Sequence, residues 1–169
     1  TRTKLPPAPL SFALDQEGGK LCVVSTTDQV YVIDEPTEQI EKVYNLKGAK
    51  GAISIAYAPE EKLLFVVSQG TDNLQILDAT DGKLKADVKV GAGPLAVVWE
   101  PVRKLAYVAN RGSDSVAVVD VNGNLVANLP GGSYANHVFT DGKGTVWSVN
   151  KARGLNDPQG DHISRYAAK

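Results

Sequence analysis

The stretch KLAYVANRGSDSVAVVD, at residues 104–120, places two apolar runs on either side of a short polar loop. The stretch KLLFVVSQGTDNLQILD repeats this pattern at residues 62–78, and KLCVVSTTDQVYVID at residues 20–34 is a looser copy. The Lys-Leu pairs that open the three stretches are 42 residues apart, and a degenerate fourth copy begins at Gly144. A fixed period of this length predicts a repeat architecture in which each unit packs on its neighbours.

Each period contains four strand-like runs, which we name A to D in chain order. Runs B and C are apolar on both faces, which is typical of strands covered on both sides. Run D alternates, most clearly at residues 83–90, where lysines occupy one face as on a solvated edge strand. These features favour an all-β β-propeller of four blades, each an antiparallel four-stranded sheet, over a β-sandwich. The expected blades span residues 9–50, 51–93, 94–134 and 135–169.

The last blade is expected to lack its outer strand, because only three runs fit between residues 135 and 169. Residues 1–5 could supply that strand in a closed four-bladed ring, or residues 1–8 could be a connection or the outer strand of an earlier blade. We favour the second interpretation, in which the chain is the C-terminal part of a larger ring. The apolar faces of the end blades would then pair with the missing blades or self-associate.

Composition sets further limits on the class of protein. The 169 residues carry a formal net charge of −1 and a single cysteine, Cys22, which excludes a disulfide within the chain. The apolar runs are strand-sized, so no membrane insertion is expected. The overall charge gives no general reason to expect a nucleic acid or a membrane surface as partner.

Residues 107–120, YVANRGSDSVAVVD, resemble the signature of the YVTN-repeat β-propeller family, with Ala109 in place of the family's threonine. The closing unit, residues 147–165, is similar to the final blade of the YncE-like periplasmic members. The resemblance implies a seven-bladed ring exported to the periplasm. It also implies a role in binding, since some members are credited with binding single-stranded DNA or with roles in the cell envelope.

Alternating strand direction places the A–B and C–D loops on one rim of the blades and the B–C and D–A loops on the other. The first rim holds twelve acids and six bases, and we call it the acidic rim. The second, the mixed rim, balances the bases Lys47, Lys50, Arg111, Lys151 and Arg153 against Asp28, Asp72, Asp114, Asp157 and Asp161. A polyanion would therefore choose the mixed rim.

The candidate ligand-binding residues lie on this mixed rim. They are three bases in B–C loops and three residues of the neighbouring D–A connection: Arg111, Lys151, Arg153, Tyr134, Asn136 and His137. Arginine beside an aromatic ring suits the stacking and phosphate contacts of a single strand. The alternative is a solvated loop with a packed tyrosine. The long loop at residues 151–161 is the feature most particular to this chain.

No catalytic set, metal site or cofactor site is expected in these residues. His137 and His162 are the only histidines, and neither has further ligands at a recognisable spacing. Cys22 lies in an apolar run without a partner base. We therefore expect a non-catalytic binding or scaffold protein of the bacterial cell envelope, with a protein partner or single-stranded DNA on the mixed rim. The alternative is part of a redox or hydrolytic enzyme whose active site lies in other blades.

Overall fold

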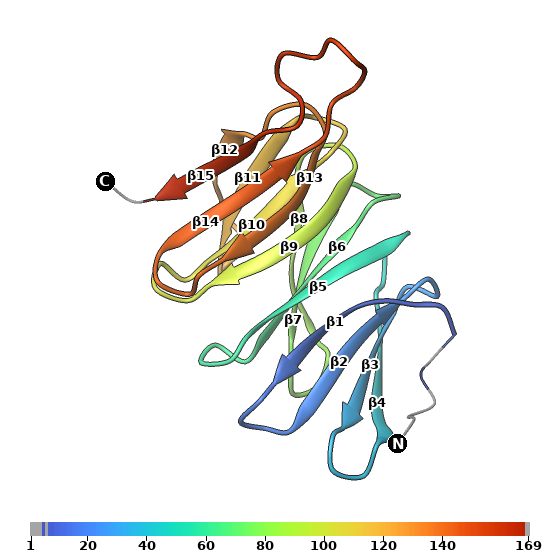
Figure 1. Ribbon diagram of the computed structural model, residues 1–169. Helices are drawn as coiled ribbons and strands as arrows, with labels where there is room; N and C mark the ends of the chain where they lie inside the picture. The colour runs from blue at the N-terminus through green and yellow to red at the C-terminus, as the bar shows by residue number, and fades with distance from the viewer. Residues whose placement is uncertain (1–4, 6, 168–169) are drawn as a thin grey trace.

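A computed structural model describes residue 5 and residues 7–167, and its strands form four separate sheets (Figure 1). Three sheets have four strands and the last has three, so the predicted all-β propeller blades are confirmed, including the shorter final blade. The described residues contain no helix, and therefore none that is long and apolar enough to cross a membrane. Most of the predicted connection at residues 1–8 lies outside the described residues.

Each blade is an antiparallel meander in which strands pair in chain order. Blade 1 comprises β1 (Pro9–Asp15), β2 (Lys20–Ser25), β3 (Gln29–Asp34) and β4 (Gln39–Asn45). Blade 2 comprises β5 (Ala52–Ala58), β6 (Leu63–Ser68), β7 (Asn73–Asp78) and β8 (Leu84–Lys89). Blade 3 comprises β9 (Pro94–Glu100), β10 (Leu105–Asn110), β11 (Ser115–Asp120) and β12 (Leu125–Pro130). Blade 4 comprises β13 (Ala135–Thr140), β14 (Thr145–Asn150) and β15 (Ile163–Ala167).

The first strands of the blades, β1, β5, β9 and β13, lie side by side and line the inner face of the array (Figure 1). The central strands β6 and β7 are buried almost throughout, whereas β8 keeps only Val88 fully buried and exposes Lys85, Asp87 and Lys89. This is the predicted order, with two covered strands followed by a solvated outer strand. Lysines along the outer strand also discourage edge-to-edge pairing.

The hydrophobic core lies at the boundaries between blades. At the boundary of blades 2 and 3, Phe65 stacks on Trp99 with ring centroids 5.1 Å apart, and both side chains belong to one apolar cluster. A second cluster joins blades 1 and 2, and a third joins blades 3 and 4. Because each inner blade is apolar on both faces, its burial requires a neighbour on each side.

One part of the predicted repeat alignment is wrong. Lys20 pairs with Asp15 in the way that Leu63 pairs with Ala58, so Lys20-Leu21 stands one residue away from the position of Lys62-Leu63. A shift of one residue turns every side chain of a strand to its other face. Cys22 therefore occupies the position of Phe65, and Leu21 occupies that of Leu64.

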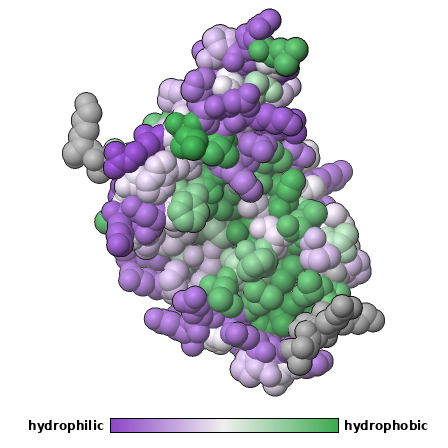
Figure 2. All heavy atoms as spheres, in the orientation of Figure 1, coloured by the Kyte–Doolittle hydropathy of each residue, from purple (hydrophilic) through white to green (hydrophobic). Residues whose placement is uncertain are grey.

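The face of blade 1 that is turned away from blade 2 is apolar and open. Leu10, Phe12 and Leu14 are 49%, 67% and 40% exposed there, and Leu21 and Val23 lie on the same face. Figure 2 shows hydrophobic residues gathered over this blade, at the lower right of the view. In an inner blade, the corresponding face is covered by its neighbour.

We expect Phe65→Ala to lower the free energy of unfolding by about 3–5 kcal/mol, because it removes a fully buried ring from a boundary between blades. Phe139→Ala is the matched control, since Phe139 is 66% exposed, and it should cost less than about 0.5 kcal/mol. Urea unfolding measures both changes. Equal losses for the two variants would contradict a core that lies between the blades.

Candidate functional site

The mixed rim is built from tight loops that repeat from blade to blade. An aspartate ends each of the first three B–C loops with positive φ, namely 55° at Asp28, 51° at Asp72 and 54° at Asp114. Each carboxylate accepts a hydrogen bond from a backbone N–H at the start of the next blade, at 2.9, 2.8 and 2.8 Å respectively. These aspartates therefore tie each B–C loop to the following D–A loop.

In the long loop between β14 and β15, two aspartates accept hydrogen bonds from the backbone of the same loop. Asp157 accepts N–H bonds from Arg153 and Gln159, and Asp161 accepts one from Ala152. The bond from the Arg153 N–H is the largest cause that lowers the pKa of Asp157 below its usual value. All five acids of the mixed rim are thus engaged by the backbone.

Tyr134 occupies a position that is held by glycine in blades 2 and 3 and by Ala8, with φ of 46°, in blade 1. Gly51 and Gly93 precede the first strands of blades 2 and 3 with φ of 69° and 60°, and Tyr134 precedes that of blade 4 with φ of 50°. A side chain in this left-handed region costs of order 1 kcal/mol, and such residues persist where surrounding contacts hold them. Here the contacts are the Asp114 carboxylate on the Tyr134 N–H and two cations over its ring.

Two guanidinium groups lie over the Tyr134 ring. The central carbons of Arg111 and Arg153 are each 4.8 Å from the ring centroid, which is cation–π range. Asp114 pairs with Arg153 at 2.6 Å, so one carboxylate partly balances the two cations. Arg111 is exposed and makes no ion pair within the described residues, and we call these four residues the Tyr134 cluster.

Three of the six predicted site residues, Arg111, Arg153 and Tyr134, therefore come together. The other three do not join them. Lys151 is exposed at the start of the long loop, and Asn136 is half-buried at a bulge of β13. His137 is exposed and contributes to a groove of about 410 Å³ along the inner strands.

Asp114 is one of the rim acids, but it is not among the six residues predicted for the site. It bonds both to the Tyr134 backbone and to the Arg153 guanidinium, and so it holds two loops of the cluster together. The recurrence of aspartate at the end of the first three B–C loops is the sequence signal that could have identified it.

The acidic rim differs from the mixed rim in the share of its basic side chains that form ion pairs. Lys20 pairs with Asp34 and Glu41, Lys83 with Asp81, Arg103 with Glu100, and Lys104 with Glu60 and Glu61. In the described residues, only Lys62 and Lys143 among the six bases of this rim make no ion pair. On the mixed rim the proportion is reversed, since Arg153 alone among its five bases is paired in the described chain.

The described residues hold no group of three or more His, Cys, Asp or Glu side chains arranged to bind a metal ion. The Cys22 thiol is buried, and desolvation is the main cause that raises its pKa to about 12. A thiol in this environment stays protonated at neutral pH.

Comparison with known proteins identifies the fold of the chain but does not assign it to a family. No protein-family model matches the chain, and no curated protein matches it. A solved structure, Kuenenia stuttgartiensis hydrazine synthase, is similar with a TM-score of 0.80 and 19% sequence identity. The match covers 91% of this chain and 45% of that one, so this chain spans less than half of its length. At this identity the likeness shows the β-propeller fold alone.

We expect Asp114→Ala to free the long loop, whereas Asp72→Ala should not. Each substitution removes a carboxylate that accepts a hydrogen bond from a backbone N–H, at a cost of about 1.5–3 kcal/mol. Only Asp114 also holds Arg153. The rate of amide hydrogen exchange should therefore rise across residues 151–161 in Asp114→Ala alone. The same rise in both variants would show that the contact between Asp114 and Arg153 does not order the long loop.

The pair formed by Lys20 and Asp34 predicts a pH dependence. The hydrogen bond from Lys20 is the main cause that lowers the pKa of Asp34 to about 2, from about 3.9 in the unfolded chain. The pair therefore stabilises the fold fully above about pH 4 and loses this effect as the pH falls toward 2. The stability difference between the natural chain and Asp34→Asn, measured by urea unfolding, should shrink over this window, and a constant difference would contradict the pairing.

Proposed function

We propose that this chain is part of a non-catalytic β-propeller that serves as a binding platform, and that its mixed rim holds single-stranded DNA. The observation that carries the proposal is the state of the charges on this rim. Its five carboxylates are turned to backbone N–H groups, while Lys47, Lys50, Arg111 and Lys151 are exposed and make no ion pair in the described part of the chain.

A rim with zero formal charge can still favour a polyanion. Carboxylates that accept bonds from backbone N–H groups of the rim are directed into its loops, whereas the lysines and Arg111 are exposed to solvent. The groups that an approaching phosphate meets first are then cations. Exposed cations along a backbone track are what sequence-independent binding of single strands requires.

The Tyr134 cluster supports contact through guanidinium groups rather than through the tyrosine ring. Two cations already lie over that ring, so a base would stack on the outer plane of Arg111, or a phosphate would bind its N–H groups. Asp114 fixes the position of Arg153. A cationic group that is held in place before binding loses less conformational freedom when the ligand arrives.

A protein partner is the second candidate, and one observation favours it. Leu155 is fully exposed in the long loop, which projects beyond the blades at the top of Figure 1. An apolar side chain presented on a projecting loop beside exposed cations suits a partner with an acidic surface around an apolar pocket.

Several broader expectations also stay proposals. A seven-bladed ring and a place in the periplasm or cell envelope rest on the YVTN-repeat resemblance. Further blades of that ring, or a second copy of the chain, would cover the open apolar face of blade 1. The alternative of a redox or hydrolytic enzyme with its active site in other blades also stays a prediction, because a likeness of 19% identity to hydrazine synthase carries no activity over.

The proposal is tested by fluorescence anisotropy with a labelled oligo-thymidine strand at low salt. Arg111→Ala should weaken binding and reduce the slope of log affinity against log salt by about 0.7, the value for one phosphate contact on a single strand. The loss should be similar for strands of different sequence, because phosphate contacts carry no sequence information.

Lys143→Ala is the matched control, since Lys143 is also exposed and unpaired in the described chain but lies on the acidic rim. Its affinity for the strand should equal that of the natural chain. Equal losses for the two variants, or no binding at about 10 mM salt, would remove the single-stranded DNA version of the proposal.

A further inference from the structure

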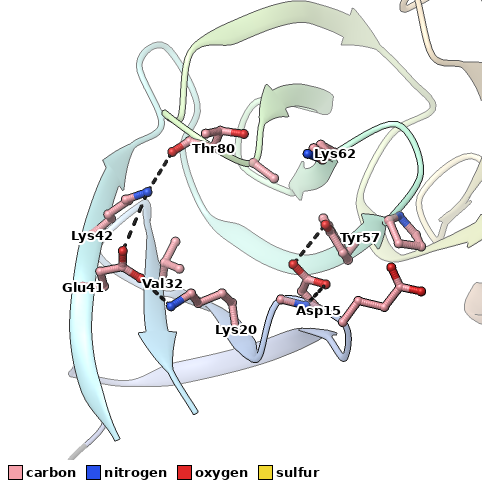
Figure 3. Close-up of a pocket in the computed structure, with 12 residues that line it drawn as sticks. Asp15, Lys20, Val32, Glu41, Lys42, Tyr57, Lys62 and Thr80 are labelled. Carbon is pink, nitrogen blue, oxygen red and sulfur yellow. Dashed lines mark hydrogen bonds and ion pairs between the residues drawn. The ribbon is translucent and has the colours of Figure 1, made fainter. Parts of the chain in front are cut away.

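A cleft of about 410 Å³ opens on the acidic rim, between blades 1 and 2 (Figure 3). Asp15 and Lys20 of blade 1 lie on one side of it, and Tyr57 and Lys62 of blade 2 lie on the other. Val32 and Ala79 add apolar surface. The cleft is separate from the mixed rim, so binding in it would be independent of the function proposed for that rim.

The cleft exists because smaller side chains stand at this boundary than at the next one. Between blades 2 and 3, Phe65 and Trp99 stack and fill the space. The equivalent positions between blades 1 and 2 are held by Cys22 and Tyr57. The loss of a phenyl ring and the exchange of an indole for a phenol leave the boundary less filled.

The same comparison shows why Lys62 lacks a partner. Its counterpart one blade later, Lys104, reaches back across the boundary to Glu61 at 2.7 Å and Glu60 at 3.4 Å. Gly18 stands in blade 1 where Glu61 stands in blade 2, and a Cβ there would meet the Asp15 carboxylate. Lys62 therefore has no acid in the place of Glu61. Glu17 stands in the place of Glu60, but Lys62 makes no ion pair in the described residues.

The other charges of the cleft are either engaged or unpaired, and the unpaired ones include Glu17, which is exposed and makes no ion pair in the described residues. Lys20 bonds to Glu41 at 2.9 Å, and Lys42 donates to the Thr80 carbonyl at 3.0 Å, so these groups are already engaged. Asp15 accepts bonds from the Tyr57 hydroxyl at 3.1 Å and the Gly18 N–H at 3.0 Å, but it has no cation in the described chain. Burial is the main cause that raises the pKa of Tyr57 to about 12, so its hydroxyl is a donor at neutral pH.

Lys62 on one side of the cleft, and the carboxylates of Asp15 and Glu17 on the other, are thus left without a counter-ion in the described residues, and the cleft also has apolar surface. We propose that this cleft binds a small zwitterion of the free amino acid type, with the ligand carboxylate on Lys62 and its ammonium group on Asp15. The apolar part of the ligand packs against Val32 and Ala79. A zwitterion meets the unpaired cation and the unpaired carboxylates at once, which neither a simple anion nor a simple amine can do.

Three probes of matched shape test the proposal by isothermal titration calorimetry: norleucine, its deaminated analogue hexanoate, and its decarboxylated analogue pentylamine. Norleucine should bind at least about tenfold more tightly than either analogue. Lys62→Met should weaken the binding of norleucine about tenfold and leave the binding of pentylamine unchanged, because of these two probes only norleucine carries a carboxylate. Asp15→Asn should weaken the binding of norleucine and of pentylamine, and it should leave the binding of hexanoate unchanged.

Lys104→Met is the control, because Lys104 holds the same place at the filled boundary. It should bind norleucine like the natural chain. Lys62 is exposed, so its replacement is not expected to disturb folding, and circular dichroism checks this. The proposal is overturned if norleucine binds no better than its analogues, if Lys62→Met behaves like Lys104→Met, or if no probe binds at about 10 mM.

Discussion

Burial between blades is the constraint on which the rest of this structure depends. A blade that is apolar on both faces is stable only when it packs against its neighbours. The strands therefore form the core, and the loops at the two rims are exposed to solvent. Function in such an array can be placed on the rims, along the inner strands or in a boundary that is incompletely filled. The chain offers a distinctive feature on each rim: the Tyr134 cluster, and the cleft at the boundary of blades 1 and 2.

Both features arise where a repeated position departs from its counterparts. Tyr134 takes the place of Gly51 and Gly93, and its strained backbone is held by Asp114 and two arginines. Cys22 takes the place of Phe65, and the boundary beside it opens. Equivalent positions in the different blades can thus be compared with one another, and the contacts that all blades share are those that packing requires. The departures are where binding is proposed.

Much of the fold could be predicted from the sequence because apolar periodicity reports burial directly. The inner, covered and outer strands follow from it, and so do the three strands of the last sheet in the described residues. The register of blade 1 could not be predicted from the sequence. Lys20-Leu21 lies 42 residues before Lys62-Leu63 and has the same two residue types, but in the structure Lys20 occupies the position of Leu63. For the site, loop position was enough to bring Arg111 and Arg153 to Tyr134, but the anchoring role of Asp114 depends on side-chain geometry that no spacing encodes.

We propose that the mixed rim presents unpaired cations because its acids are held by the backbone, and that this asymmetry directs a polyanion to one side of the blades. The most direct measurement is an amide hydrogen-exchange footprint of the chain with and without single-stranded DNA. We expect protection confined to the B–C and D–A loops, strongest at residues 111–114 and 151–161. Protection on the A–B and C–D loops, or no protection at low salt, would contradict binding at the mixed rim.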